Sequence, residues 1–234
     1  MQQRKISRKS EIRDFLNRVS HQEYTLFAQS LNDDILVHRV KFPLLEFIAD
    51  ELFRDWQWED LVRLCDDVAD FNHISSWPLI GKILQNNLTN DLDSSFRLAV
   101  HYIIKGNEWH VCDCISERVF GNGLLLNFPP SFDRLNELII HPNSWIKRVS
   151  GIAVHLAAKR GLSSDEAKML IELLLLQKNN TNTQVQKGCG WGIETIAKFH
   201  PDLAQSYEKQ IFDGQTKAWI IKKYKLGLAK SKRF

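Results

Sequence analysis

The chain has 234 residues, 44% of them hydrophobic, and its 31 basic and 28 acidic side chains leave a formal net charge of +3. This ordinary globular composition suits one elongated domain or two small ones. The longest apolar runs, residues 124–126 and 173–176, are too short to span a bilayer. The polar first residues lack the apolar segment of a signal peptide. We therefore expect a soluble, cytoplasmic protein without a membrane partner.

The four cysteines, Cys65, Cys112, Cys114 and Cys189, are scattered along the sequence. They form no Cys-x-x-Cys pair, and the chain has no His-Glu-x-x-His motif, so we do not expect a zinc site. Free thiols are the default state in a reducing cytosol. We expect a protein that needs neither a metal nor a cofactor.

Charge is distributed unevenly along the chain. Residues 46–70 are rich in aspartate and glutamate, whereas no acidic residue follows Gly214 and lysines accumulate there. Such polarity is typical of a protein with one face turned towards a polyanion. The basic tail, about 217–234, is either a nonspecific DNA contact or a solvated end.

Apolar residues recur at helical spacing along most of the chain. The predicted helices cover residues 9–20, 21–31, 43–52, 58–71, 77–88, 91–104, 109–120, 129–141, 145–161, 165–177, 183–200, 201–212 and 216–230. The seventh of these is expected to stop at Gly121-Asn122-Gly123. No segment shows the sustained alternation of a strand, so the fold class is all-α.

Two helical stretches repeat at an offset of 39 residues. Residues 146–151 and 185–190 both run aliphatic, polar, basic, variable, small, then glycine. This period is typical of HEAT and armadillo repeats, whose helix pairs stack into a solenoid. We therefore predict that residues 1–234 form one HEAT/armadillo-like helical repeat solenoid with a concave basic groove. Arg148 and Lys187 would form a basic ladder on one wall of that groove.

A carboxylate and an indole are spaced to share one helix face. Trp109 and Asp113 are four residues apart, so both side chains project from the same side of a helix. A carboxylate next to a large aromatic surface is partly desolvated and needs a cationic partner, which Arg148 or Lys187 can supply. The alternative is that Trp109 is a core residue and Asp113 a solvated or capping acid.

Other reactive groups near this pair have plain structural interpretations. Cys112 and Cys114 flank Asp113, but no ordered Cys-His-acid pattern accompanies them, which favours structural thiols. His110 points about 100° round the helix from Trp109 and is not expected in the same pocket. The small residues of 188–192 permit close backbone approach, either between helices or towards DNA. Trp219 is expected to be a core or groove-edge residue.

Three motifs in order resemble the AlkD-type DNA alkylation repair glycosylases. These are the pair Trp109 and Asp113, the stretch Trp145-Ile146-Lys147-Arg148, and the stretch Gln186-Lys187-Gly188-Cys189-Gly190-Trp191. The resemblance covers the chain from about Ile35 to the C-terminus. It implies a HEAT-like DNA glycosylase that removes cationic alkylated purines, of the 3-methyladenine and 7-methylguanine type, from double-stranded DNA without drawing the lesion into a base pocket.

The resemblance also implies roles for individual residues. Asp113 would be the catalytic carboxylate, Trp109 and Trp191 would contact the deoxyribose, and Arg148 would hold a backbone phosphate. Three lysines, Lys41, Lys147 and Lys187, would be further DNA contacts of a protein that works as a monomer.

Two positions depart from the family pattern. Glu46 and Glu194 stand where the family has arginine, and each removes a positive charge from a possible phosphate contact. Two other hypotheses therefore stay open: a DNA-binding HEAT-like protein without catalytic activity, and a repeat scaffold that binds protein partners.

Overall fold

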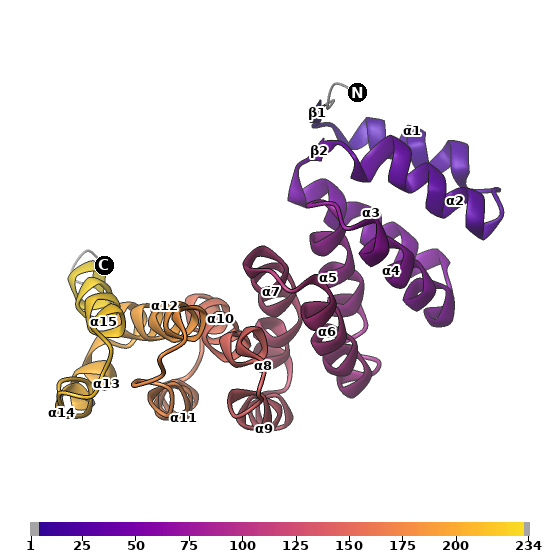
Figure 1. Ribbon diagram of the computed structural model, residues 1–234. Helices are drawn as coiled ribbons and strands as arrows, with labels where there is room; N and C mark the ends of the chain where they lie inside the picture. Colours follow the sequence, from indigo (N-terminus) through magenta and orange to yellow (C-terminus); the bar gives the residue numbers. More distant parts are fainter. Residues whose placement is uncertain (1–4, 232–234) are drawn as a thin grey trace. The chain divides into compact units, whose positions relative to one another are not determined.

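The computed structural model describes residues 5–231, and within that range nearly every regular element is a helix (Figure 1). The chain divides into two compact units, residues 1–91 and 92–234. The predicted all-α fold class is confirmed. None of the described helices is both long and apolar enough to cross a membrane.

Among the described residues, the first unit contains five α-helices, one π-helical turn and one very short strand pairing. Its elements are β1 (Lys5–Ile6), α1 (Lys9–Val19), α2 (Tyr24–Leu31), the π-helical turn η1 (Asn32–Leu36), β2 (Arg39–Val40), α3 (Phe42–Asp55), α4 (Trp58–Phe71) and α5 (Ser76–Asn86). The parallel pairing of β1 with β2 was not predicted, because two residues are too few to show alternation. Pro43 lies in the first turn of α3, as its fixed φ angle favours.

The second unit contains the predicted site residues apart from Lys41. Its elements are α6 (Leu92–Gly106), α7 (Trp109–Ser116), the π-helical turn η2 (Glu117–Gly121), α8 (Asn122–Leu126), α9 (Phe128–Ile139), α10 (Ser144–Arg160), α11 (Ser164–Leu175), α12 (Thr183–Phe199), α13 (Pro201–Ser206), α14 (Glu208–Ile211) and α15 (Ala218–Ser231). Within this unit α7, α10, α12 and α15 pack successively side by side, and α9, α11 and α13 form a second layer (Figure 1).

Two predicted helix boundaries were wrong. The chain does not end its helix at Gly121-Asn122-Gly123 but stays helical through η2 into α8. Gly121 is buried in right-handed geometry, and a Cβ there would lie 2.7 Å from Leu156, so this glycine serves packing instead of helix termination. The predicted helix 201–212 breaks at Tyr207, whose ring is buried and whose hydroxyl donates to Glu172.

The two helices that carry the repeated motif, α10 and α12, each begin with an asparagine N-cap. The side chain of Asn143 accepts hydrogen bonds from the first-turn amides of α10, and that of Asn182 does the same for α12. These two asparagines are themselves 39 residues apart. Arg148 and Lys187 therefore occur at the same position, five residues after the cap, in two adjacent helices.

Candidate functional site

Asp113 and Arg148 form a bidentate ion pair between α7 and α10. Arg148 Nε donates to Asp113 Oδ1 at 2.8 Å, and Arg148 Nη2 donates to Asp113 Oδ2 at 2.8 Å. The arginine side chain is only 3% exposed and that of the aspartate 13% exposed. Burial of either charge alone is costly, so each group offsets the charge of the other and holds it in one orientation.

Helix α12 completes the surroundings of the guanidinium. Arg148 Nη1 donates to the backbone carbonyl of Gln184 at 3.1 Å. A Cβ atom at Gly188 would lie 2.9 Å from Arg148 Cγ, so only glycine lets α12 pack this closely. The guanidinium carbon also lies 5.6 Å from the centre of the Trp191 ring. The arginine is thus packed between the carboxylate of one helix and the backbone of another.

A cleft of about 300 Å³ opens beside this ion pair. Its walls are formed by six residues from four helices: Trp109, Arg148, Gln184, Lys187, Trp191 and Trp219. Trp109 is 58% exposed, which is unusual for an indole unless the ring serves a surface function. The two tryptophans predicted to contact a sugar therefore line one cavity, and the ion-paired arginine lines it as well.

The geometry decides between the two interpretations of the first motif. Trp109 is largely exposed, so it is not a core residue, and Asp113 is mostly buried in an ion pair and is not the N-cap of α7. The predicted cationic partner of the carboxylate is Arg148, whereas Lys187 is exposed at the cleft. Arg148 and Lys187 reach the same cleft, but the guanidinium is buried against Asp113 while the ammonium faces solvent.

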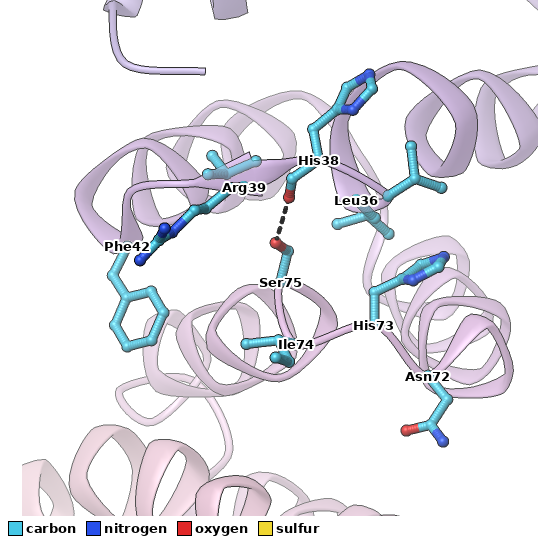
Figure 2. Close-up of a pocket in the computed structure, with 10 residues that line it drawn as sticks. Leu36, His38, Arg39, Phe42, Asn72, His73, Ile74 and Ser75 are labelled. Carbon is cyan, nitrogen blue, oxygen red and sulfur yellow. Dashed lines mark hydrogen bonds between the residues drawn. The ribbon is translucent and has the colours of Figure 1, made fainter. Parts of the chain in front are cut away.

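The two remaining predicted DNA contacts, Lys147 and Lys41, do not line this cleft. Lys147 is half-buried on α10 and is not among the residues that line the cleft. Lys41 is the exposed N-cap of α3 in the first unit. Its neighbours Val40 and Phe42 border a separate cleft of about 600 Å³, where Ser75 Oγ donates to the carbonyl of His38 at 3.2 Å (Figure 2).

A second cleft of this unit, of about 350 Å³, shares Trp191 with the first. Its walls are His155, Lys159, Trp191, Glu194, Thr195, Lys198, Phe199, Lys223 and Lys230. Trp191 therefore belongs to both cavities. The Lys223 ammonium lies 5.9 Å from the centre of the Trp191 ring and 5.2 Å from the centre of the Trp219 ring. Lys223 therefore makes cation–π contacts with both indoles.

Glu194 forms two ion pairs with α15 in this second cleft. Its Oε2 accepts from Lys223 Nζ at 2.7 Å, and its Oε1 accepts from Lys230 Nζ at 2.5 Å. Although burial opposes ionisation, the bonds from the two ammonium groups hold the pKa of Glu194 below its ordinary value. The side chain is therefore a carboxylate at neutral pH.

His155 is held neutral in the same cleft. The Thr195 hydroxyl donates to the carbonyl of Trp191 at 2.9 Å, and His155 Nδ1 lies 2.7 Å from that hydroxyl oxygen. Since the hydroxyl proton is used, Nδ1–H is the donor to Thr195 and Nε2 is unprotonated. Burial, helped by the nearby Lys159 charge, lowers the pKa of His155.

The cysteines near the ion pair are poorly suited to nucleophilic chemistry. Burial raises the pKa of Cys112 to about 12 and that of Cys114 to about 11. Cys112 Sγ also donates to the carbonyl of Trp145 at 3.3 Å. Because a thiolate is the reactive form, these side chains are structural, as the sequence suggested.

Sequence reasoning left Trp219 as a core or groove-edge residue and missed the lysines that α15 contributes to the second cleft. Trp219 lines the first, and Lys223 and Lys230 line the second. A signal was present, because Ile220, Tyr224 and Gly227 recur at helical spacing and all three are buried. That pattern predicts a packed helix, not a solvated tail. The last residues of the predicted tail, 232–234, lie outside the described residues.

Comparison with known proteins identifies one family and two similar folds. A family described as "DNA alkylation repair enzyme" matches residues 12–222. No curated protein sequence matches the chain. The crystal structure of AlkD2 from Streptococcus mutans is similar in fold, with a TM-score of 0.69 and 18% sequence identity over 88% of this chain and 97% of that one. The crystal structure of smu.31 from Streptococcus mutans UA159 aligns with a TM-score of 0.67 and 16% identity over 88% and 98% of the respective chains.

At these identities the structural likeness shows the fold alone, whereas the family match covers most of the sequence. It includes all three motifs and every residue of the ion pair and the first cleft. The chain belongs to the DNA alkylation repair enzyme family.

Proposed function

We propose that this protein is a monofunctional DNA glycosylase that hydrolyses the N-glycosidic bond of cationic alkylated purines in duplex DNA. The observation that carries the proposal is the Asp113 carboxyl group, fixed by two hydrogen bonds from Arg148, which itself lines a cleft together with Trp109 and Trp191. Membership of the DNA alkylation repair enzyme family supports DNA as the substrate.

The chemistry of the substrate explains why one carboxylate suffices. An N3- or N7-alkylated purine already carries a positive charge, so it leaves without protonation by a general acid. When the bond from C1′ to the base nitrogen breaks, its electron pair neutralises the purine, and the sugar gains oxocarbenium character. A fixed carboxylate stabilises that developing cation and orients the attacking water. The water oxygen bonds to C1′, and its proton passes to the carboxylate or to solvent.

Asp113 keeps the capacity for this role despite its ion pair. Each carboxylate oxygen has two lone pairs, and the arginine uses one on each oxygen. The side chain is 13% exposed, which leaves it accessible to water. The indoles of Trp109 and Trp191 add electron-rich surfaces that attract a sugar with cationic character. In this arrangement the main role of Arg148 is to hold Asp113 in place. We propose Lys187, Lys147 and Lys41 as the contacts to phosphates.

We further propose that the protein acts as a monomer on DNA, since the ion pair and both clefts are built from a single chain. Sedimentation of the complex with a short duplex should give a one-to-one mass. A two-to-one mass would contradict this.

Release of free base from methylated duplex DNA tests the function directly. We expect the wild-type protein to liberate 3-methyladenine or 7-methylguanine. Asp113→Asn, once a melting curve shows that it folds with Arg148 unpaired, should lose this activity while binding the duplex nearly as well. Full activity of Asp113→Asn would remove the carboxylate from the mechanism. If the wild-type protein binds duplex DNA but releases no base, it is a non-catalytic DNA-binding relative. If it has no salt-sensitive affinity for DNA, it is a scaffold for protein partners.

A further inference from the structure

The second cleft, which shares Trp191 with the first, contains an excess of positive charge that the glycosylase chemistry does not use. It is lined by Lys159, Lys198, Lys223 and Lys230 against the single carboxylate of Glu194. With His155 neutral, this is a formal excess of three positive charges. Four ammonium groups converging on one cavity repel one another, and an anion in the cavity relieves that repulsion.

The position of two of these lysines is set by one buried acid. Lys223 and Lys230 are seven residues apart on α15, so both project from the same face two turns apart. Glu194 is 13% exposed and binds one of them with each carboxylate oxygen. Each ammonium has three protons, and the bond to Glu194 uses one. Two donors on each lysine are left for another acceptor.

The backbone geometry of α15 is built around the same acid. A Cβ atom at Gly227 would lie 2.3 Å from the carbonyl oxygen of Glu194, so α15 approaches α12 here at a distance that only glycine allows. Lys223 comes before this contact on α15 and Lys230 after it. The crossing point of the two helices therefore coincides with the ion cluster.

We propose that this cleft binds a backbone phosphate of duplex DNA, and that Glu194 is a positioning residue that aims Lys223 and Lys230 at it. The proposal deepens the proposed function and rests on it, because Trp191 is the common wall of this cleft and the first one. A strand whose sugar lies against Trp191 in the first cleft carries a phosphate next to that sugar. Glu194 then supports DNA binding although its own charge repels DNA.

If Glu194 positions the two lysines, removing its charge should change DNA affinity in the opposite direction from the one that net charge alone predicts. Glu194→Gln removes a negative charge, which by itself tightens binding to a polyanion. If Glu194 positions the two lysines, the same change releases them and weakens binding to an unmodified duplex, by about threefold or more at low salt. Lys230→Gln should lower the slope of log affinity against log salt concentration by about 0.9, the value for one lost phosphate contact.

The matched control is Asp133→Asn, which makes the same charge change at an exposed position on α9. It should bind duplex DNA as well as the wild type or slightly better. Melting curves for all variants check the fold, and Lys230→Gln keeps the test valid if Glu194→Gln unfolds, because the Lys230 side chain is 43% exposed. Tighter or unchanged binding by folded Glu194→Gln, or an unchanged salt slope for Lys230→Gln, overturns the proposal.

Two further measurements distinguish the phosphate site from the proposed glycosylase function and from a site for free phosphate. Base release by the wild-type protein reports on the proposed function alone. If the wild type excises the base but Lys230→Gln has an unchanged salt slope, only the proposed phosphate site is contradicted. Inorganic phosphate, followed by its ³¹P resonance at constant ionic strength, probes a site for free anion. A Lys230→Gln variant that loses phosphate binding but keeps its affinity for DNA would assign the cleft to free phosphate and not to the DNA backbone.

Discussion

At the scale of the residue, the bidentate pair of Asp113 and Arg148 is the best-defined feature of the site. We predict that Arg148→Gln destabilises the protein by about 3–5 kcal/mol, because it leaves a mostly buried carboxylate without its cationic partner. Urea denaturation measures this loss.

A suitable control is Arg134→Gln, which breaks only solvent-exposed pairs with Glu137 and Asp93. That change should cost less than about 1 kcal/mol. Equal losses in the two variants would show that the buried pair contributes no more than a surface one.

His155 makes the stability of the fold depend on pH. Lys159 on its own helix, Lys223 on α15, Glu194 on α12 and Asp113 on α7 are the charged groups that act on it, and burial is the largest influence on its lowered pKa. Because the unfolded histidine takes up a proton at a higher pH than the folded one, this contribution to stability is complete above the usual pKa of 6.5 and is lost as pH falls below it.

We therefore predict a lower urea midpoint at about pH 5.5 than at about pH 7.5 for the wild type. His155→Asn should show a smaller difference, since it removes the titrating group. His200, whose pKa burial also lowers, contributes to the part that remains. An identical drop in the variant would mean that His155 does not titrate in this way.

At the scale of the element, close glycine contacts determine how α10 packs against α12. A Cβ atom at Gly151 would lie 2.1 Å from the carbonyl carbon and oxygen of Gly188. We predict that Gly151→Ala forces the two helices apart and costs about 1–3 kcal/mol or more in the free energy of unfolding. It should also reduce base release, because α10 carries Arg148 and α12 carries Trp191.

The comparison variant is Thr183→Ala, at the exposed start of α12. A surface substitution of this kind should stay within about 0.5 kcal/mol of the wild type. If Gly151→Ala is equally mild, the helices are able to separate without loss, and the small residues of the repeated motif are not required for packing.

At the scale of the whole molecule, the family match runs uninterrupted across residue 91, where the chain divides into two units. We propose on this ground that residues 1–234 behave as one domain. Calorimetry should then show one cooperative unfolding transition whose van't Hoff and calorimetric enthalpies agree. Two separate transitions would instead indicate independent domains.

Affinity for DNA is also a property of the whole charge distribution. We predict that binding to duplex DNA weakens as salt rises, and that Lys187→Gln lowers the slope of log affinity against log salt concentration by about one. Lys168→Gln, an exposed lysine on α11 that lines neither cleft, should leave the slope unchanged. Equal slopes for the two variants would exclude Lys187 as a phosphate contact.

The sequence by itself determined the helical fold class, most helix positions and four residues of the first cleft, Trp109, Arg148, Lys187 and Trp191. Apolar spacing, caps such as Asn143, and the 39-residue repeat are local patterns, and local patterns are readable without a structure. The pair Trp109 and Asp113 was recognisable for the same reason, because both residues are on one helical turn.

Only the tertiary structure decided how these residues pair. That Arg148 binds Asp113, that Gly121 packs instead of ending a helix, and that α15 brings Trp219 and two lysines to the site all depend on contacts between segments distant in sequence. Glu194 is the clearest case, since from sequence it is only a lost positive charge. In the folded protein it holds Lys223 and Lys230, because helix crossing determines which charges become neighbours.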